Sequence, residues 1–252
     1  MIVATDRPRS RVAARKVPVI GILFWVLKIL TTAMGEVTSD YFVRSFNPFI
    51  VVPLAGLLLL AALGLQLRAR RYVPWTYWFA VVMVAVFGTM AADVLHIELG
   101  IPYLVSTTVF ALTLAVIFGA WYSSEGTLSI HSIDTRRREL FYWAAVLATF
   151  ALGTAAGDMT ASTLGLGYFG SGILFAILIA IPAIGWRWFS WNAILAFWTA
   201  YVLTRPLGAS FADWVGRPRN LSGIGLGTGL VSLGLSLVIV VIVGYLTAID
   251  AS

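Results

Sequence analysis

The chain has 252 residues, of which 60% are hydrophobic and 11% are charged, with a mean hydropathy of +0.92. Because water-soluble domains carry about 25% charged residues, this composition excludes a soluble globular protein and indicates an integral membrane protein. The lack of cysteine excludes a disulfide framework and a thiolate metal site. The net charge of +6 is distributed in a way that indicates membrane topology, not nucleic-acid binding.

Eight apolar segments follow a polar, basic N-terminal stretch, and each is long enough to cross a bilayer, which takes about 20 helical residues. They lie at 17–38, 47–67, 75–95, 101–122, 141–161, 168–187, 190–212 and 225–248. The sequence therefore predicts an all-α, eight-helix membrane domain over 17–248. Residues 1–16 are interpreted as a cytoplasmic tail and not as a cleavable signal peptide.

The pattern [FY]-W-x9-G-x4-D occurs four times in the odd-numbered segments, each time without a gap. Its members are Phe24, Trp25, Gly35 and Asp40; Tyr77, Trp78, Gly88 and Asp93; Tyr142, Trp143, Gly153 and Asp158; Phe197, Trp198, Gly208 and Asp213. The pattern defines four two-helix repeats at about 17–67, 75–122, 141–187 and 190–248. Two spans per repeat give all four repeats the same orientation, so they are parallel and not inverted.

We expect a pseudo-fourfold or nested pseudo-twofold bundle with the odd-numbered helices inside. These helices carry the Gly, Ala, Ser and Thr residues that allow close helix packing in lipid, whereas the even-numbered ones are plain Leu, Val and Ala. The motif Trp and Gly residues are interpreted as structural marks of the repeat.

The Lys and Arg residues indicate the orientation, because they concentrate on the cytoplasmic side of membrane proteins. One side receives Arg7, Arg9, Arg11, Arg15, Lys16, Arg68, Arg70, Arg71, Arg136, Arg137, Arg138 and Arg187. The other side receives only Arg44, Arg217 and Arg219. Both termini are therefore expected to be cytoplasmic, with the four motif Asp residues near the outer face.

The motif Asp residues are the main candidates for function. At 100° per residue, the Trp and the residues eleven and fifteen positions later share one helix face, so the four carboxylates could meet at one outer mouth. Ionisable groups within a membrane usually face the bundle interior or a water-filled path, and an Asp at a helix C-terminus opposes the helix dipole. The alternative is that each Asp shapes a loop or caps a short following helix.

Three further ionisable residues depart from the repeat. Glu36 adds a second carboxylate beside Asp40, on the same face and one turn away. Lys28 and Arg205 lie within spans, Arg205 on the motif face and Lys28 off its centre. Glu36 and the motif Asp residues are their expected partners. The two cations would tune the charge of a binding site or, alternatively, only neutralise carboxylates.

His96 follows Asp93 by three positions, and the two side chains could together ligate a divalent cation such as Mg or Mn. The alternative is an interfacial histidine with no ligand role. No phosphate-binding loop, zinc-protease motif or nucleophile elbow is present. We therefore expect neither an enzyme nor a cofactor.

The four motif units and the connection Ser-Ile-His-Ser-Ile-x-Thr-x-Arg-Arg-Glu at 129–139 resemble the bacterial family of "uncharacterised membrane-anchored proteins". That family consists of four tandem two-helix repeats of unknown function. The resemblance implies an eight-span protein of the bacterial inner membrane and brings no substrate or catalytic residues. More loosely, Gly35-Glu36 and Gly157-Asp158 are similar to short motifs of repeat-built cation exporters.

The leading hypothesis is a secondary transporter of a small cation, in particular a proton-coupled divalent metal exporter. Asp40, Asp93, Asp158, Asp213 and Glu36 would bind the cation or a proton. The alternative is a scaffold or an assembly or lipid-interaction protein that transports nothing. A lipid- or quinone-directed enzyme is least favoured. The expected partners are the bilayer and a small cation or proton, without nucleic acid, and a homo-oligomer is left open.

Overall fold

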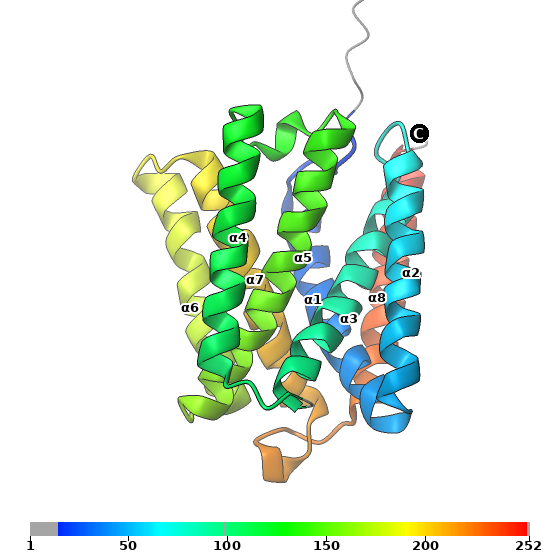
Figure 1. Cartoon of the computed structure of the whole chain (residues 1–252), viewed down its shortest axis with the longest axis vertical. Coiled ribbons are helices and arrows are strands. Elements are labelled where there is room, and N and C mark those ends of the chain that lie inside the picture. Colours follow the sequence, from blue (N-terminus) through cyan, green and yellow to red (C-terminus); the bar gives the residue numbers. More distant parts are fainter. Residues whose placement is uncertain (1–14, 98, 251–252) are drawn as a thin grey trace, which may run out of the picture.

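The computed structural model describes residues 15–97 and 99–250, which form eight long α-helices joined by short connections (Figure 1). The helices are α1 (Ile22–Ser45), α2 (Pro48–Arg68), α3 (Pro74–Ile97), α4 (Tyr103–Glu125), α5 (Arg136–Asp158), α6 (Gly167–Trp188), α7 (Ala193–Gly216) and α8 (Thr228–Asp250). Three short turns, η1 (Ile130–Ser132), η2 (Met159–Thr163) and η3 (Arg219–Leu221), complete the chain. The predicted all-α class is confirmed, while Arg7, Arg9 and Arg11 of the predicted tail lie outside the described residues.

Several helix boundaries follow from local side-chain chemistry. Asn47, Thr135 and Asn192 each accept a hydrogen bond from a backbone N–H in the first turn of α2, α5 and α7, which satisfies a donor that the helix leaves free. Helix α4 ends at Gly126, whose φ of 68° is accessible to glycine at little cost. Helix α1 begins at Ile22, after Pro18 and Gly21, and therefore later than the predicted 17.

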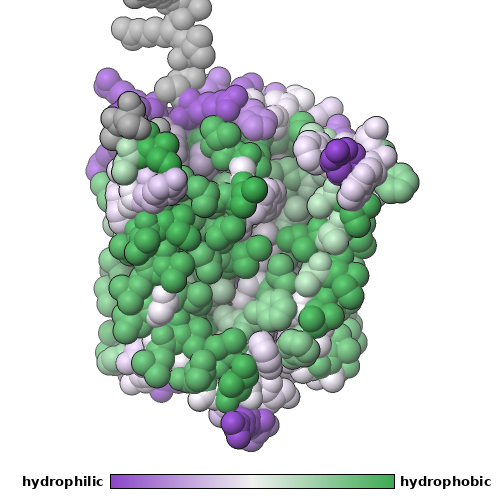
Figure 2. All heavy atoms as spheres, turned by 180° about the vertical axis from the view of Figure 1, so that it is seen from behind, coloured by the Kyte–Doolittle hydropathy of each residue, from purple (hydrophilic) through white to green (hydrophobic). Residues whose placement is uncertain are grey.

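Seven of the eight helices are long and apolar enough to cross a membrane. The exception to the predicted eight is α7, which has 24 residues but includes Arg205, Pro206 and Asp213. These polar residues lower its hydropathy, and they are buried in the bundle. The protein is thus a multi-pass membrane protein by helix length and hydropathy. In Figure 2 a broad band of hydrophobic side chains covers one face between more hydrophilic ends.

The odd-numbered helices form the interior of the bundle. Helix α1 contacts α3, α3 contacts α5, α5 contacts α7, and α7 contacts α1, so the four close into a ring. Between 61% and 67% of the apolar windows of α1, α3 and α5 are buried, against 11% to 28% in α2, α4, α6 and α8. Each even-numbered helix packs mainly against the first helix of the next repeat: α2 on α3, α4 on α5, α6 on α7, and α8 on α1.

The motif glycines make the close contacts of this ring. A Cβ at Gly35 would overlap Ala85, one at Gly88 would lie 3.0 Å from the Cβ of Phe150, one at Gly153 would overlap Arg205, and one at Gly208 would overlap Thr32. In each case the neighbouring residue lies seven positions after the Trp of the next repeat. For Gly208 of the fourth repeat, the next repeat around the ring is the first. The same pair of positions meets four times around the ring, which is the relation that a pseudo-fourfold axis produces.

The aromatic pairs repeat this cyclic relation at the other end of the ring. The ring before the Trp in each repeat contacts the Trp of the next: Phe24 with Trp78, Tyr77 with Trp143, Tyr142 with Trp198, and Phe197 with Trp25, at centroid separations of 5.6 to 6.2 Å. Trp78, Trp143 and Trp198 are buried and Trp25 is half-buried. The motif Trp residues therefore hold neighbouring repeats together.

Candidate functional site

Five sets of equivalent residues line the interior of the ring, four residues apart along each helix. From the start of the odd helices we name them the aromatic layer (Phe24, Tyr77, Tyr142, Phe197), the lysine layer (Lys28, Val81, Val146, Tyr201), the arginine layer (Thr32, Ala85, Phe150, Arg205), the glutamate layer (Glu36, Thr89, Thr154, Ala209) and the aspartate layer (Asp40, Asp93, Asp158, Asp213). All are buried except Asp93 and Asp158, which are half-buried. Acidic or basic side chains thus occupy four successive layers inside a membrane protein and are absent from the aromatic layer.

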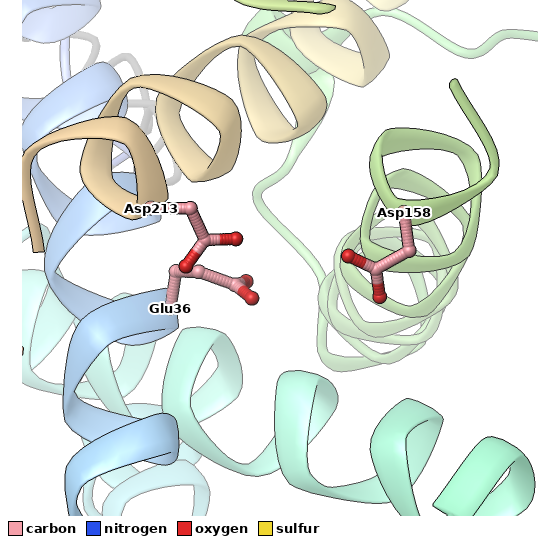
Figure 3. Close-up of side chains that lie close together, drawn as sticks. All are labelled: Glu36, Asp158 and Asp213. Atoms are coloured by element: carbon pink, nitrogen blue, oxygen red, sulfur yellow. The ribbon is translucent and has the colours of Figure 1, made fainter. Parts of the chain in front are cut away.

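Three carboxylates come together where the glutamate and aspartate layers meet. Glu36 on α1, Asp158 at the end of α5 and Asp213 on α7 each offer an oxygen, and these oxygens lie within 4.8 Å of one another. In Figure 3 the carboxylate of Asp158 points across the interior toward Glu36 and Asp213. A spacing of this size suits oxygen ligation of a hard cation such as Mg²⁺ or Mn²⁺.

Asp40 and Asp213 are joined by a residue that sequence reasoning did not single out. Arg217 donates from Nη2 to Asp40 Oδ1 at 3.0 Å and from Nε to Asp213 Oδ1 at 3.0 Å. Arg44 lies farther from Asp40, with 3.7 Å between Nε and Oδ1. Arg217 follows Asp213 by four positions, one helical turn, and this spacing was the signal available in the sequence.

Asp93 differs from the other three motif Asp residues. It is half-buried, it is not one of the three clustered carboxylates, and within 15–97 and 99–250 its side chain has no hydrogen-bond or ion-pair partner. Asp158 likewise has no such partner in the described part of the chain, although it belongs to the cluster. The aspartate layer is therefore asymmetric, with two carboxylates held by Arg217 and two without a basic partner.

Arg205 occupies the centre of the ring and contacts all three other repeats. Its Nη2 atom donates to Glu36 Oε2 at 2.6 Å, to Thr154 Oγ1 at 2.8 Å and, by a short contact, to Thr89 Oγ1. Its Nη1 atom donates to the carbonyl of Thr32 at 3.3 Å. The predicted pairing of Arg205 with Glu36 is thus present. The partners Glu36, Thr89 and Thr154 are equivalent residues of the first three repeats.

Lys28 is as deeply buried as Arg205, but aromatic rings surround it in place of the predicted carboxylates. Its Nζ atom is 3.9 Å from the ring centroid of Phe150 and 4.2 Å from that of Tyr201, and no described group accepts a hydrogen bond from it. The expected carboxylate partner is absent among the described residues. Lys28 also lies on the interior face itself, because it is four residues from both Phe24 and Thr32, and not off its centre.

His96 is not available to ligate a metal together with Asp93 in this arrangement. Its Nδ1 atom lies 2.7 Å from the carbonyl oxygen of Ile101, to which it donates, and its Nε2 atom lies 3.1 Å from Ser106 Oγ. The imidazole also lies against Tyr103, with 3.8 Å between ring centroids and 37° between the ring planes. Both nitrogens hold the α3–α4 connection together, which favours the alternative of a histidine without a ligand role. The neighbouring Glu98 lies outside the described residues.

A π-helical turn, η2, follows Asp158 directly. Such turns are rare and frequently occur at functional sites. Thr160 in this turn makes a short hydroxyl contact with Ser171 on α6, and Ser210 on α7 donates to Ser171 at 3.2 Å. These buried hydroxyls fix the end of α5 against α6 and α7, and thereby position the Asp158 carboxylate.

A second buried polar group lies at the opposite end of the bundle. Lys16 Nζ donates to Glu139 Oε2 at 2.5 Å, and Gln66 Nε2 donates to Glu139 Oε1 at 3.0 Å and to the carbonyl of Lys16 at 3.3 Å. Glu139 is fully buried in the first turn of α5. This network ties the segment before α1 to α2 and α5, and it could not be predicted from the sequence.

The fold and site define a multi-pass α-helical membrane protein built from four tandem repeats around a charged interior. The family described as "Repeat of Unknown Function" (DUF347) matches residues 23–72, 76–127, 141–190 and 196–251, and the chain belongs to this family. The predicted division into four two-helix repeats is thereby confirmed, with similar boundaries. Searches of curated proteins and of solved structures gave no match.

Proposed function

We propose that this protein is a secondary transporter of a small cation, and specifically a proton-coupled exporter of a divalent metal. The observation that carries the proposal is the approach of Glu36, Asp158 and Asp213 to within 4.8 Å in the interior of the helix ring. Bringing carboxylates together in a membrane interior is costly unless a cation or protons compensate their charge. Arg205 compensates Glu36 in this structure, which leaves Asp158 without a basic partner among the described residues.

The layers of the interior support a cation pathway that is interrupted at the aromatic layer. Ionisable side chains extend from the aspartate layer to Lys28, over about 18 Å at 1.5 Å per residue. Beyond them the aromatic layer is closed: Tyr77 and Tyr142 share a short hydroxyl hydrogen bond, and Phe24 and Phe197 lie 6.1 Å apart between ring centroids. An interior that is polar on one side and closed by packed rings on the other fits one state of an alternating-access cycle.

The proposal includes the membrane topology. The aromatic end of the bundle carries Arg68, Arg70, Arg71, Arg136, Arg137, Arg138 and Arg187, whereas the aspartate end carries Arg44, Arg217 and Arg219. The excess of positive charge supports a topology in which the aromatic end and both termini face the cytoplasm of a bacterial cell, with the protein in the inner membrane and the aspartate layer near the outer face. Cysteine labelling from either side of the membrane at 127–129 and 223–227 tests this orientation.

The transport activity is tested by flux into proteoliposomes across a panel of Mn²⁺, Mg²⁺, Zn²⁺, Co²⁺ and Na⁺. We expect flux of at least one cation, and a loss of at least about tenfold, equivalent to ~1.4 kcal/mol, in Asp158→Asn. Asp134→Asn is the matched control, because Asp134 lies near the aromatic end and pairs with Arg138. Flux of none of the five cations, or unchanged flux in Asp158→Asn, contradicts the proposal and favours the non-transporting scaffold.

A further inference from the structure

Lys28 is a buried basic group of the interior column that the proposed cation site does not employ. Its side chain is 1% exposed, and its Nζ atom has no hydrogen-bond acceptor among the described residues. The equivalent positions in the second and third repeats are Val81 and Val146, so packing at this level of the ring does not itself require a polar side chain. A buried ammonium without a carboxylate is costly, and a lysine placed in this way calls for a role.

Two cations lie close to one aromatic ring in this part of the column. Lys28 Nζ is 3.9 Å from the centroid of Phe150, and the Cζ atom of Arg205 is 5.4 Å from the same centroid. Among the described residues, Glu36 is the one carboxylate that balances them by direct contact, and it is bound to Arg205. The charge on Lys28 and the position of the Arg205 guanidinium are therefore coupled electrostatically.

We infer that Lys28 carries the proton that the transporter exchanges for its cation, an inference that rests on the proposed function. When a metal cation binds to Glu36, Asp158 and Asp213, it competes with the Arg205 guanidinium for the Glu36 carboxylate. Arg205 then loses its counter-charge while it remains next to Phe150 and Lys28. Repulsion between the two cations favours loss of the Lys28 proton: the ammonium becomes a neutral amine, and one proton passes to the water on the side from which the metal cation entered.

The groups around Lys28 fit this exchange. The titratable or charged side chains that face it are Arg205 and Tyr201 from α7, with Tyr142 from α5 and Tyr77 from α3 in the aromatic layer one turn away. Glu36 lies two turns away on α1 itself and is held by Arg205. None of the described groups around Lys28 is a carboxylate in contact with it, so its charge responds to Arg205 and, through Arg205, to the cation.

The test uses the full-length protein in proteoliposomes with Mn²⁺ as the probe and compares two measurements. The first is exchange of Mn²⁺ for labelled Mn²⁺ at equal pH on both sides, and the second is Mn²⁺ accumulation driven by a pH gradient. In Lys28→Gln and Lys28→Met we expect exchange within about twofold of the wild type, whereas gradient-driven accumulation falls at least about tenfold, since no proton is carried. In Lys28→Arg, where the charge is permanent, we expect both measurements to fall.

Arg187→Gln is the matched control, because it removes one exposed positive charge from α6 outside the column, and we expect it to retain both activities. Gradient-driven accumulation at the wild-type level in Lys28→Gln would overturn the inference and leave the proposed function standing. Loss of folding in all three Lys28 variants, judged by gel filtration, would assign the lysine to packing and would overturn it too. Absence of Mn²⁺ exchange in the wild type would instead contradict the proposed function itself.

Discussion

Glu36 on α1 accepts a hydrogen bond of 2.6 Å from Arg205 on α7, and both side chains are buried. The pair joins the first repeat to the last across the seam where the ring closes. Arg205 also reaches Thr89 and Thr154, so one guanidinium connects the interior faces of all four repeats. Of the three ionisable residues that break the fourfold equivalence, Glu36 and Arg205 are therefore the two that meet at the centre.

Removing one partner of this pair should destabilise the protein more than removing both. Arg205→Met leaves the Glu36 carboxylate buried without its cation, and the loss of one partner of a buried ion pair costs about 3–5 kcal/mol. In Glu36→Gln/Arg205→Met the stranded charge is gone, and we expect at least about half of that loss to be recovered. Unfolding of the purified variants in detergent measures the effect, and additive losses in the double variant would contradict the pairing.

The closing contact of the ring should tolerate no side chain at Gly208. A Cβ there would overlap Thr32 Oγ1 and lie 3.0 Å from the backbone nitrogen of Ala33 and the carbonyl of Ile29. We expect Gly208→Ala to destabilise by about 1–3 kcal/mol, the usual cost of overpacking. Gly64→Ala, in α2 with open space around it, is the control and should be neutral or stabilising by a few tenths to about 1 kcal/mol. Equal thermal stability of the two variants would refute the close approach of α1 and α7.

The interior column can be mapped with single cysteines, because the natural chain has none. We expect a membrane-impermeant maleimide to label Asp93→Cys and Asp158→Cys, whose native side chains are half-buried. Val81→Cys and Val146→Cys, which lie in the fully buried lysine layer, should stay unlabelled. Labelling of the lysine layer at the same rate as the aspartate layer would show that the column is open and not closed in this state.

Arg217 should weaken cation binding in the wild type, because its ion pair with Asp213 competes with the cation for that carboxylate. In Arg217→Gln the Asp213 and Asp40 carboxylates lose their shared guanidinium, and we expect the apparent KM for the transported cation to fall about fivefold, or ~1 kcal/mol for a partly exposed pair. Arg219→Gln is the matched control, because Arg219 lies on the same connection, is exposed and makes no ion pair in the described part of the chain. A KM that rises in Arg217→Gln, or shifts equally in both variants, would contradict this assignment.

Much of the fold could be predicted from periodicity alone. The spacing of Trp, Gly and Asp fixed the four repeats, and the small residues beside Gly35, Gly88, Gly153 and Gly208 placed the odd helices inside. Two features could not be obtained in this way. The packing of each even helix on the next repeat depends on contacts between segments far apart in sequence, and the low hydropathy of α7 follows from the same buried charges that make it central.

The candidate site was only partly predictable. The helical face that carries the motif correctly predicted an interior position for Glu36 and Arg205. Thr89 and Thr154 occupy the same position as Glu36, eleven residues after the motif Trp. Their contacts with Arg205 could not be predicted from that position. Lys28 was misplaced because the face was measured from the Trp; measured from Phe24, one residue earlier, Lys28 falls on the interior row. The partner of Asp40 could not be foreseen, since Arg217 lies 177 positions later in the sequence, in the fourth repeat.

The central claim is that Glu36, Asp158 and Asp213 together bind the transported cation. Calorimetric titration of the purified protein with Mn²⁺ tests it most directly, using Asp158→Asn and Asp213→Asn beside the control Asp134→Asn. We expect Mn²⁺ to bind the wild type and Asp134→Asn with the same affinity, and the other two variants with an affinity at least about tenfold lower. Equal Mn²⁺ affinity in all four proteins would contradict it.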